Sequence, residues 1–285
     1  MRICALNLLV GLVGIALAGE IAPAAAQAVS PRPGTSAQPT PSFVWQSDAA
    51  EDSAVMALGS ADLIGTDPRF LTRAVLQLTA QSFDRMFRLQ PAMPLLGKRC
   101  DAVNALYSRE RRAVVLCYEL AEAYAPIFAR ADPSAGRTRW AARVLKAMHF
   151  AVAHEVGHAL IDRLKLPVLG REEDAADQFA LWYITTSPDD DYEYRLGKVS
   201  SFSYALLALS TGETRRGSAY ADVHSLAVQR VSNLTCWMSG YARTLGLSAD
   251  AMEEVLPADR RAGCVREYLA LSNTWGRLLN AYVAR

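Results

Sequence analysis

The sequence has little of several features that would assign it to a class of protein. Its formal net charge is only +1, and no block of like charge stands out along the 285 residues. A nucleic-acid-binding protein favours a basic face, so the charge pattern gives no support to a nucleic-acid partner. Beyond the N-terminal segment, no apolar run reaches the ~20 residues that span a bilayer. There is no internal repeat, and 51% apolar with 21% charged residues is the composition of an ordinary globular protein.

Cysteine is scarce, and its spacing argues against one kind of metal site. None of the five cysteines stands in a CxxC or CxxH spacing, as a cysteine-based zinc site would require. Cys4 lies in the N-terminal apolar segment. The even number that remains is typical of disulfides in an exported chain. Four cysteines allow three pairings, and we expect the local pairs Cys100–Cys117 and Cys236–Cys264, with buried free thiols as the alternative.

Residues 1–28 have the pattern of a secretory signal peptide. Arg2 gives a short positive region, Ile3–Ala18 is an apolar run, and small residues cluster over 22–28. Ala24-Ala25-Ala26 fits a small-x-small cleavage site. The alternative is an N-terminal membrane anchor, but the run is short for a span of ~20 residues. We therefore expect an exported protein, periplasmic or extracellular, with no stable membrane span after cleavage.

A linker and one folded domain are expected to follow. Residues 29–45 are rich in Pro, Ser, Thr and Gly, which is typical of a disordered linker. Residues 46–285 then form the domain. Periodicity predicts a helix over 67–89, extended segments within 93–117 with a turn at 108–111, and helices near 118–130, 138–164, 171–185, 198–209, 222–245 and 264–283. The predicted fold class is α+β and mainly helical, with a small antiparallel sheet or hairpin before the helix at 138–164.

One motif on that long helix carries chemistry. His154-Glu155-Val156-Gly157-His158 is an HExxH motif. Residues four apart lie on one face of a helix, so both imidazoles can reach one metal ion. Glu155 is rotated from His154 by about 100°, because one turn takes 3.6 residues. It can therefore stand beside the metal without binding it and take a proton from metal-bound water.

The surroundings strengthen this interpretation. Residues 148–161 (MHFAVAHEVGHALI) are apolar nearly all round, which predicts a buried helix. Burying ionisable groups without partners is costly, and a metal ion with its water explains two histidines and a glutamate there. The alternative is a chance match on an exposed helix. His149 lies about 140° around the helix from His154, so we interpret it as structural.

A catalytic zinc ion needs a third protein ligand and one open position. The metzincin pattern would place a histidine at residue 164, where Leu164 stands. A glutamate from the next helix is the alternative, and Glu173 and Asp177 share a helix face. Glu173 could bind the ion while Asp177 accepts the free N–H of a ligand histidine. Glu172 and Asp174 stay open as ligands, since the helix dipole favours any acidic residue in a first turn.

An HExxH helix followed by an E-x-x-x-D helix resembles the gluzincin group of zinc peptidases. The chain is also similar to an uncharacterised family of exported bacterial proteins described only as candidate metallopeptidases. The similar segments are NALYSRERRAVVLCYEL (104–120), HEVGHALIDRLKLPVLGREEDAADQFA (154–180), HSLAVQRVSNLTCW (224–237) and, less closely, residues 264–279. The resemblance implies a zincin-like domain in which His154, His158 and Glu173 bind Zn²⁺.

The resemblance also suggests roles in substrate binding. Asn104-Ala105 resembles the edge strand with which gluzincins hold the substrate backbone, because such a strand offers unpaired N–H and C=O groups. An ordinary hairpin strand is the alternative. In gluzincin-like mechanisms a later His or Tyr stabilises the oxyanion. His224 is the candidate, with Tyr220 behind it, and a core or capping histidine is the alternative.

Motif and resemblance together predict a secreted zinc metallopeptidase that hydrolyses a peptide or protein substrate. The ion would lower the pKa of its water to about 7, and Glu155 would be the general base. Two alternatives stay open: a non-catalytic, zinc-stabilised binding protein of the cell envelope, and a zinc amidohydrolase acting on a non-peptide amide. Glu155 argues mildly against the first, because a structural site has no need of it.

Overall fold

The computed structural model describes residues 40–47, 67–188, 190–211, 218 and 221–284. Every element named below belongs to the segment that runs from Pro41 to the C-terminus. The predicted signal peptide (1–28) and residues 29–39 of the predicted linker lie outside the described residues.

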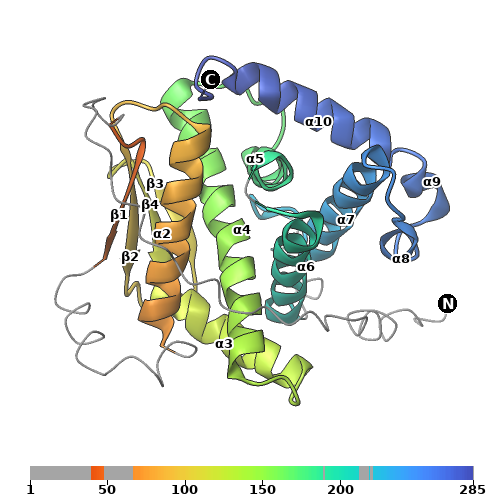
Figure 1. The fold of residues 1–285 in the computed structure, drawn as a ribbon, viewed down its shortest axis with the longest axis horizontal. Coiled ribbons are helices and arrows are strands. Elements are labelled where there is room, and N and C mark those ends of the chain that lie inside the picture. Colours follow the sequence, from red (N-terminus) through yellow and green to blue (C-terminus); the bar gives the residue numbers. More distant parts are fainter. Residues whose placement is uncertain (1–39, 48–66, 189, 212–217, 219–220, 285) are drawn as a thin grey trace, which may run out of the picture. The chain divides into compact units, whose positions relative to one another are not determined.

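A four-stranded sheet in the order β1-β2-β4-β3 lies on one side of α2 and α4 (Figure 1). The strands are β1 (Phe43–Ser47), β2 (Met93–Lys98), β3 (Ala105–Ser108) and β4 (Ala113–Cys117). The predicted antiparallel hairpin is the pair β3–β4, and β3 is an edge strand. The other pairs, β1–β2 and β2–β4, are parallel, so the sheet is mixed and not antiparallel throughout.

Strand β1 overlaps the predicted linker. Phe43 is buried and pairs with Met93, so the last three residues of the segment 29–45 belong to the sheet. The chain passes from β1 through α2 (Pro68–Met86) to β2, and a parallel pair needs such a crossover connection.

The long helices reproduce the predicted series, and two short helices, α8 and α9, were not predicted. They are α2, α3 (Tyr118–Ala131), α4 (Arg137–Leu164), α5 (Glu172–Thr186), α6 (Tyr192–Leu209), α7 (Ala227–Thr244), the short α8 (Asp250–Glu253) and α9 (Ala258–Arg261), and α10 (Cys264–Leu279). Two starts differ from the prediction. Helix α6 begins at Tyr192 because Asp191 caps it, its side chain accepting the Tyr194 N–H. Helix α7 begins only at Ala227, after a loop that ends at the cap Leu226.

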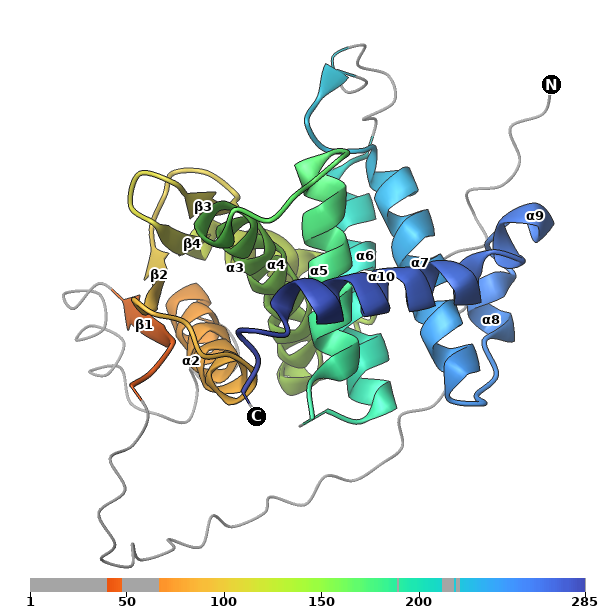
Figure 2. The ribbon, with the colours of Figure 1, turned by 90° about the horizontal axis from the view of Figure 1, so that it is seen from above.

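Helix α4 is the centre of the domain. It contacts α2, α3, β3 and β4 on one side and α5 and α6 on the other, and α10 crosses over α5 and α7 (Figures 1 and 2). Every residue from Ala147 to Ile161 is buried. The predicted helix, apolar nearly all round, is therefore confirmed, and the HExxH motif lies in the core.

Close packing brings α5 against the HExxH stretch of α4. A Cβ atom added at Gly157 would lie 3.1 Å from the Ala176 Cα atom and 3.2 Å from a Phe179 ring carbon. Only a residue without a side chain leaves room for this approach. Gly157 therefore allows the first turn of α5, with its three acidic residues, to reach the two histidines.

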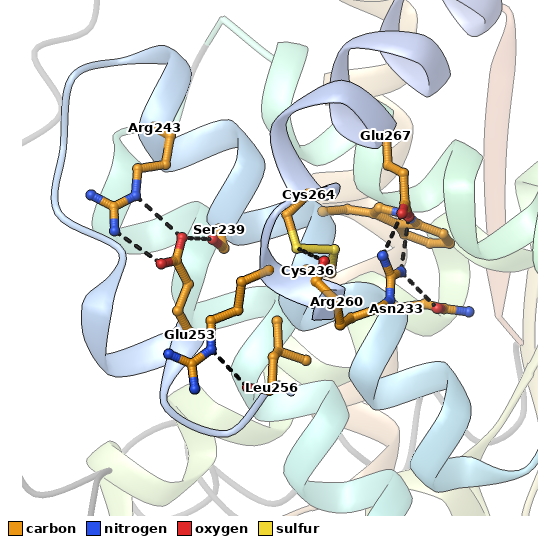
Figure 3. The surroundings of a disulfide bond; sticks show 11 residues. Asn233, Cys236, Ser239, Arg243, Glu253, Leu256, Arg260, Cys264 and Glu267 are labelled. Atoms are coloured by element: carbon orange, nitrogen blue, oxygen red, sulfur yellow. Dashed lines mark hydrogen bonds and ion pairs between the residues drawn. A yellow bond between two sulfur atoms is a disulfide. The ribbon is translucent and has the colours of Figure 1, made fainter. Parts of the chain in front are cut away.

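Both predicted disulfides are present. Cys100–Cys117 joins the end of β4 to the segment that follows β2, and Cys236–Cys264 joins α7 to the first residue of α10. Ion pairs of Arg243 with Glu253 and of Arg260 with Glu267 flank the second disulfide (Figure 3). Within the described part of the chain, no helix is long and apolar enough to cross a membrane.

Candidate metal centre

Three side-chain atoms from α4 and α5 converge on one point. His154 Nε2 and His158 Nε2 lie 3.2 Å apart. Glu173 Oε2 lies 3.1 Å from the first nitrogen and 3.3 Å from the second. The helical spacing of the motif aligns the histidines, and Glu173 reaches them from the first turn of α5.

This cluster fits a single metal ion. Zn–N and Zn–O bonds of about 2.0–2.2 Å in tetrahedral geometry place the ligand atoms about 3.3–3.6 Å apart. The three observed distances are 3.1, 3.2 and 3.3 Å. Two imidazoles with one carboxylate are also a ligand set that zinc takes at catalytic sites, with a further position left for water. The three side chains expected from the sequence therefore lie together, at or slightly below the spacing of zinc ligands.

Asp177, the residue proposed from the sequence to accept from a ligand histidine, lies behind His154. Its Oδ1 atom is 2.8 Å from His154 Nδ1, a contact that keeps a proton on Nδ1 and makes Nε2 the nitrogen that can bind a metal. Arg230 of α7 in turn donates to both Asp177 oxygens, from Nε at 2.8 Å and from Nη2 at 2.7 Å. Arg230 was not among the predicted site residues, because the sequence marks it only as an arginine on the apolar side of a helix.

The two other acidic candidates contact different groups. Glu172 Oε1 lies 2.8 Å from His158 Nδ1, on the far side of that ring from the cluster, and Glu172 also accepts from Arg109. Asp174 accepts a hydrogen bond of 2.9 Å from the Ser225 hydroxyl. Of the three carboxylates in this turn, Glu173 is the one in contact with both Nε2 atoms.

Glu155 is buried and bonded to the edge strand. The Tyr107 backbone N–H in β3 donates to Glu155 Oε2 at 2.8 Å, and the Tyr107 hydroxyl donates to Asp162 of α4 at 3.0 Å. Burial disfavours the charged carboxylate and raises the pKa of Glu155. A carboxylate with a raised pKa beside a metal centre is suited to accept a proton from water.

Neighbouring charges set the protonation of the ligands. Burial alone would lower the pKa of His154, but the carboxylate of Asp177 beside it raises that pKa to about 9. Burial opposes ionisation of Glu173, yet hydrogen bonds from His154, His158 and His224 hold its pKa well below the usual range. A histidine binds a metal ion only through an unprotonated nitrogen, so binding of a cation to His154 and His158 releases protons.

His224 reaches the same cluster from the loop before α7. Its Nε2 atom lies 2.9 Å from Glu173 Oε2, and its Nδ1 atom lies 3.1 Å from Asp222. Arg171, just before α5, donates to the carbonyls of Asp222 at 3.3 Å and of His224 at 3.0 Å. The side chain of His224 stays 48% exposed, so it faces the open side of the centre. Tyr220, the second candidate, lies outside the described residues.

A cavity of about 640 Å³ opens over the centre. The edge-strand segment 104–107, which contains the predicted Asn104 and Ala105, lines one wall, and residues 221–224 line another. Glu155, His158 and Glu173 also line the cavity. The arrangement is an open cleft between a strand edge and a loop, which His158 and Glu173 of the cluster reach while His154 lies buried beneath.

A comparison with models of protein families assigns the chain to a family. The model of the family DUF4344, described as "Putative metallopeptidase", matches residues 66–279. The chain belongs to this family. In this DUF4344 protein the matched range contains the HExxH helix, the acidic turn, His224, Arg230 and both disulfides. The resemblance to an uncharacterised metallopeptidase family is therefore confirmed. No curated protein and no solved structure matches the chain.

Proposed function

We propose that this protein is an exported, zinc-dependent peptidase. The observation that carries the proposal is the convergence of His154 Nε2, His158 Nε2 and Glu173 Oε2 within 3.1–3.3 Å, beside the buried Glu155 and under an open cleft. A structural zinc site is closed by protein ligands, whereas a catalytic one keeps a position open. Membership of the metallopeptidase family supports metal-dependent hydrolysis at the family level.

In the proposed reaction, the bound ion and the side chains of the protein have separate roles. When bound, zinc supplies Lewis-acid polarisation and a lowered pKa for water. Tyr107 N–H holds Glu155 Oε2, which leaves Oε1 to accept the proton of the attacking water and return it to the leaving amine. His224 has Nδ1 3.1 Å from Asp222 and Nε2 2.9 Å from Glu173, and in its protonated form it would offer the Nε2–H to the oxygen that gains charge. Asp177 keeps His154 in the metal-binding tautomer throughout.

The edge of the sheet suits an extended peptide. Strand β3 has its neighbour β4 on one side only, and Asn104 and Ala105 face the cleft. Backbone N–H and C=O groups at such an edge can pair with a substrate in extended conformation. This favours a peptide or protein substrate over a small amide.

The location follows from a separate argument. The N-terminal pattern favours secretion, and two disulfides persist in oxidising compartments and not in the cytosol. We place the mature protein in the periplasm or outside the cell.

The test is a comparison of the wild type with Glu155→Gln. Purified protein, loaded with zinc, is incubated with a mixed peptide library and with unfolded protein. We expect the variant to keep its zinc and to lose activity by about 10²–10⁴-fold, the usual contribution of a general base. The exposed Glu254→Gln is the matched control, with unchanged activity. Undiminished hydrolysis by Glu155→Gln would refute the role of this residue.

One observation favours a second candidate, a non-catalytic zinc protein. Because His224 Nε2 lies only 2.9 Å from Glu173 Oε2, it is within reach of the same ion and could close the centre with a fourth protein ligand. The same experiment, with small acyl amides added as substrates, separates the two functions. A zinc-loaded wild type that cleaves no peptide, protein or small acyl amide is the result that this alternative requires. Cleavage of acyl amides without peptides would instead indicate an amidohydrolase.

A further inference from the structure

Arg230 lies buried behind the candidate metal centre, although it comes from a helix that supplies none of the three converging atoms. Its exposed fraction is 8%. Its guanidinium donates two hydrogen bonds, of 2.8 and 2.7 Å, to the two oxygens of Asp177. Such a bidentate pair fixes both the position and the plane of a carboxylate. The guanidinium carbon also lies over the ring of Phe202 in α6, 5.6 Å from its centroid.

Asp177, whose carboxylate Arg230 holds in place, contacts the metal-ligand candidate His154. Its Oδ1 atom accepts from Arg230 Nη2 and from His154 Nδ1, at 2.7 and 2.8 Å. The plane of the carboxylate therefore depends on Arg230, and the rotation of the His154 ring depends on the carboxylate. The contacts run from α7 through α5 to the ligand on α4.

The balance of charge supports the same role. Glu172, beside His158, is paired with Arg109; the other carboxylates at the centre are those of Glu155, Glu173 and Asp177, of which Glu155 and Asp177 are buried. A divalent ion and Arg230 together bring three positive charges to oppose them. Without the guanidinium, Asp177 would be a buried carboxylate without its charge partner, a costly state that is relieved by movement of the side chain.

We propose that Arg230 is a positioning residue of the metal centre. It touches neither metal nor substrate, and it sets metal affinity by holding Asp177, and through Asp177 the His154 ring, in the orientation that binds the ion. This rests on the proposed function only in requiring that a metal binds at His154, His158 and Glu173; hydrolysis is not needed. Loss of groups that orient a metal ligand typically costs 10–100-fold in affinity.

The experiment measures zinc affinity by competition with a chromophoric chelator, alongside thermal unfolding of the metal-free proteins. Arg230→Met removes the positive charge and both hydrogen bonds to Asp177. Arg230→Lys keeps the charge but cannot donate to both carboxylate oxygens in the planar geometry of a guanidinium. Lys198→Met is the matched control, since it breaks another buried ion pair, with Asp190, that does not touch the centre. The absorption spectrum of bound Co²⁺ reports ligand geometry independently of activity.

We expect Arg230→Met to weaken zinc binding by about 10–100-fold and Arg230→Lys to weaken it less, both with altered Co²⁺ spectra. Lys198→Met is expected to lose thermal stability and keep its zinc affinity. Arg230→Met with lowered stability but unchanged affinity and spectrum overturns the proposal, because Arg230 is then only structural. If Arg230→Met does not fold, the zinc affinity and the Co²⁺ spectrum of Arg230→Lys are compared with the wild type, and unchanged values overturn the proposal. A wild type that binds no zinc overturns the metal centre itself, which is a separate result.

Discussion

At the scale of single residues, the partner of each buried histidine decides its charge. His154 and His149 lie on the same helix, and both are buried. Asp177 raises the pKa of His154 to about 9. His149 instead faces the Tyr183 hydroxyl and the ammonium of Lys198, at 3.4 and 3.5 Å, and burial together with that cation holds its pKa well below the ordinary value. The first histidine can exchange a proton for a metal ion, while the second stays neutral in the core.

The state of His149 predicts a dependence of stability on pH. Below about pH 6.5 the unfolded chain binds a proton at this residue and the folded protein does not, so the free energy of unfolding falls as pH falls. The contribution reaches at most about 1.4 kcal/mol per pH unit. His149→Gln keeps a polar group and does not titrate. Urea unfolding from pH 7 to 5, at constant metal content, should show a shallower pH dependence in the variant; identical slopes would contradict the assignment.

The residues that the sequence located are those linked by local spacing. His154, Glu155 and His158 follow from one helical turn, and Glu173 with Asp177 from the next helix. Arg230 could not be found in this way, because its contact with Asp177 spans 53 residues and depends on where α7 packs. His224 was found through resemblance, while its contact with Glu173 depends on a loop whose path no periodicity encodes.

At the scale of elements, the centre depends on how closely α5 approaches α4. Helix α4 ends at Leu164, and Lys165 has a left-handed backbone with φ of 51°, a common way to stop a helix. Only residues 165–171 then join the two helices. The first turn of α5 therefore lies over the HExxH stretch, with Glu173 directed at the histidines.

Gly157→Ala tests this packing. Alanine favours a helix over glycine by about 1 kcal/mol, so an exposed replacement should stabilise. At Gly157 the new Cβ meets backbone atoms of Ala176 at 3.1 and 3.3 Å, and α5 must move. We expect destabilisation of about 1–3 kcal/mol together with weaker zinc binding. Gly276→Ala on α10, where nothing lies within 4 Å of the new atom, is the matched control. Equal effects of the two substitutions in chemical unfolding would contradict the packing argument.

The sequence predicted helices better than strands for a physical reason. Helical periodicity is local, so the ranges of α2, α3, α4 and α5 came within a few residues of the structure. Parallel pairing joins segments far apart in the chain, as between Phe43 and Met93, and leaves no local pattern. Strand β1 was also short and followed a Pro/Ser-rich stretch, which hid its boundary.

At the scale of the whole molecule, one metal ion would connect helices that are otherwise joined by packing. Its ligands come from α4 and α5, Arg230 of α7 holds the residue behind one of them, and the loop with His224 contacts Glu173. An ion that binds only the folded chain adds its binding free energy to the stability of the fold.

Removal of metal should therefore lower the melting temperature. At free zinc of 1,000 times Kd the ion adds about 4 kcal/mol to the free energy of unfolding. We expect a chelator to lower the melting temperature of the wild type and added zinc to restore it. Asp222→Asn, which leaves the three ligands in place, should respond like the wild type. A melting temperature that is indifferent to chelation would show that no ion is bound to the folded state.

The most direct test of the metal centre is the metal content of three purified proteins: wild type, Glu173→Gln and Asp174→Asn. The two substituted carboxylates are neighbours in the first turn of α5, yet Glu173 contacts both histidine Nε2 atoms and Asp174 contacts Ser225. After loading and removal of excess zinc, we expect about one ion per chain in the wild type and in Asp174→Asn, and far less in Glu173→Gln. No bound ion in any of the three, or equal amounts in all, would contradict the centre formed by His154, His158 and Glu173.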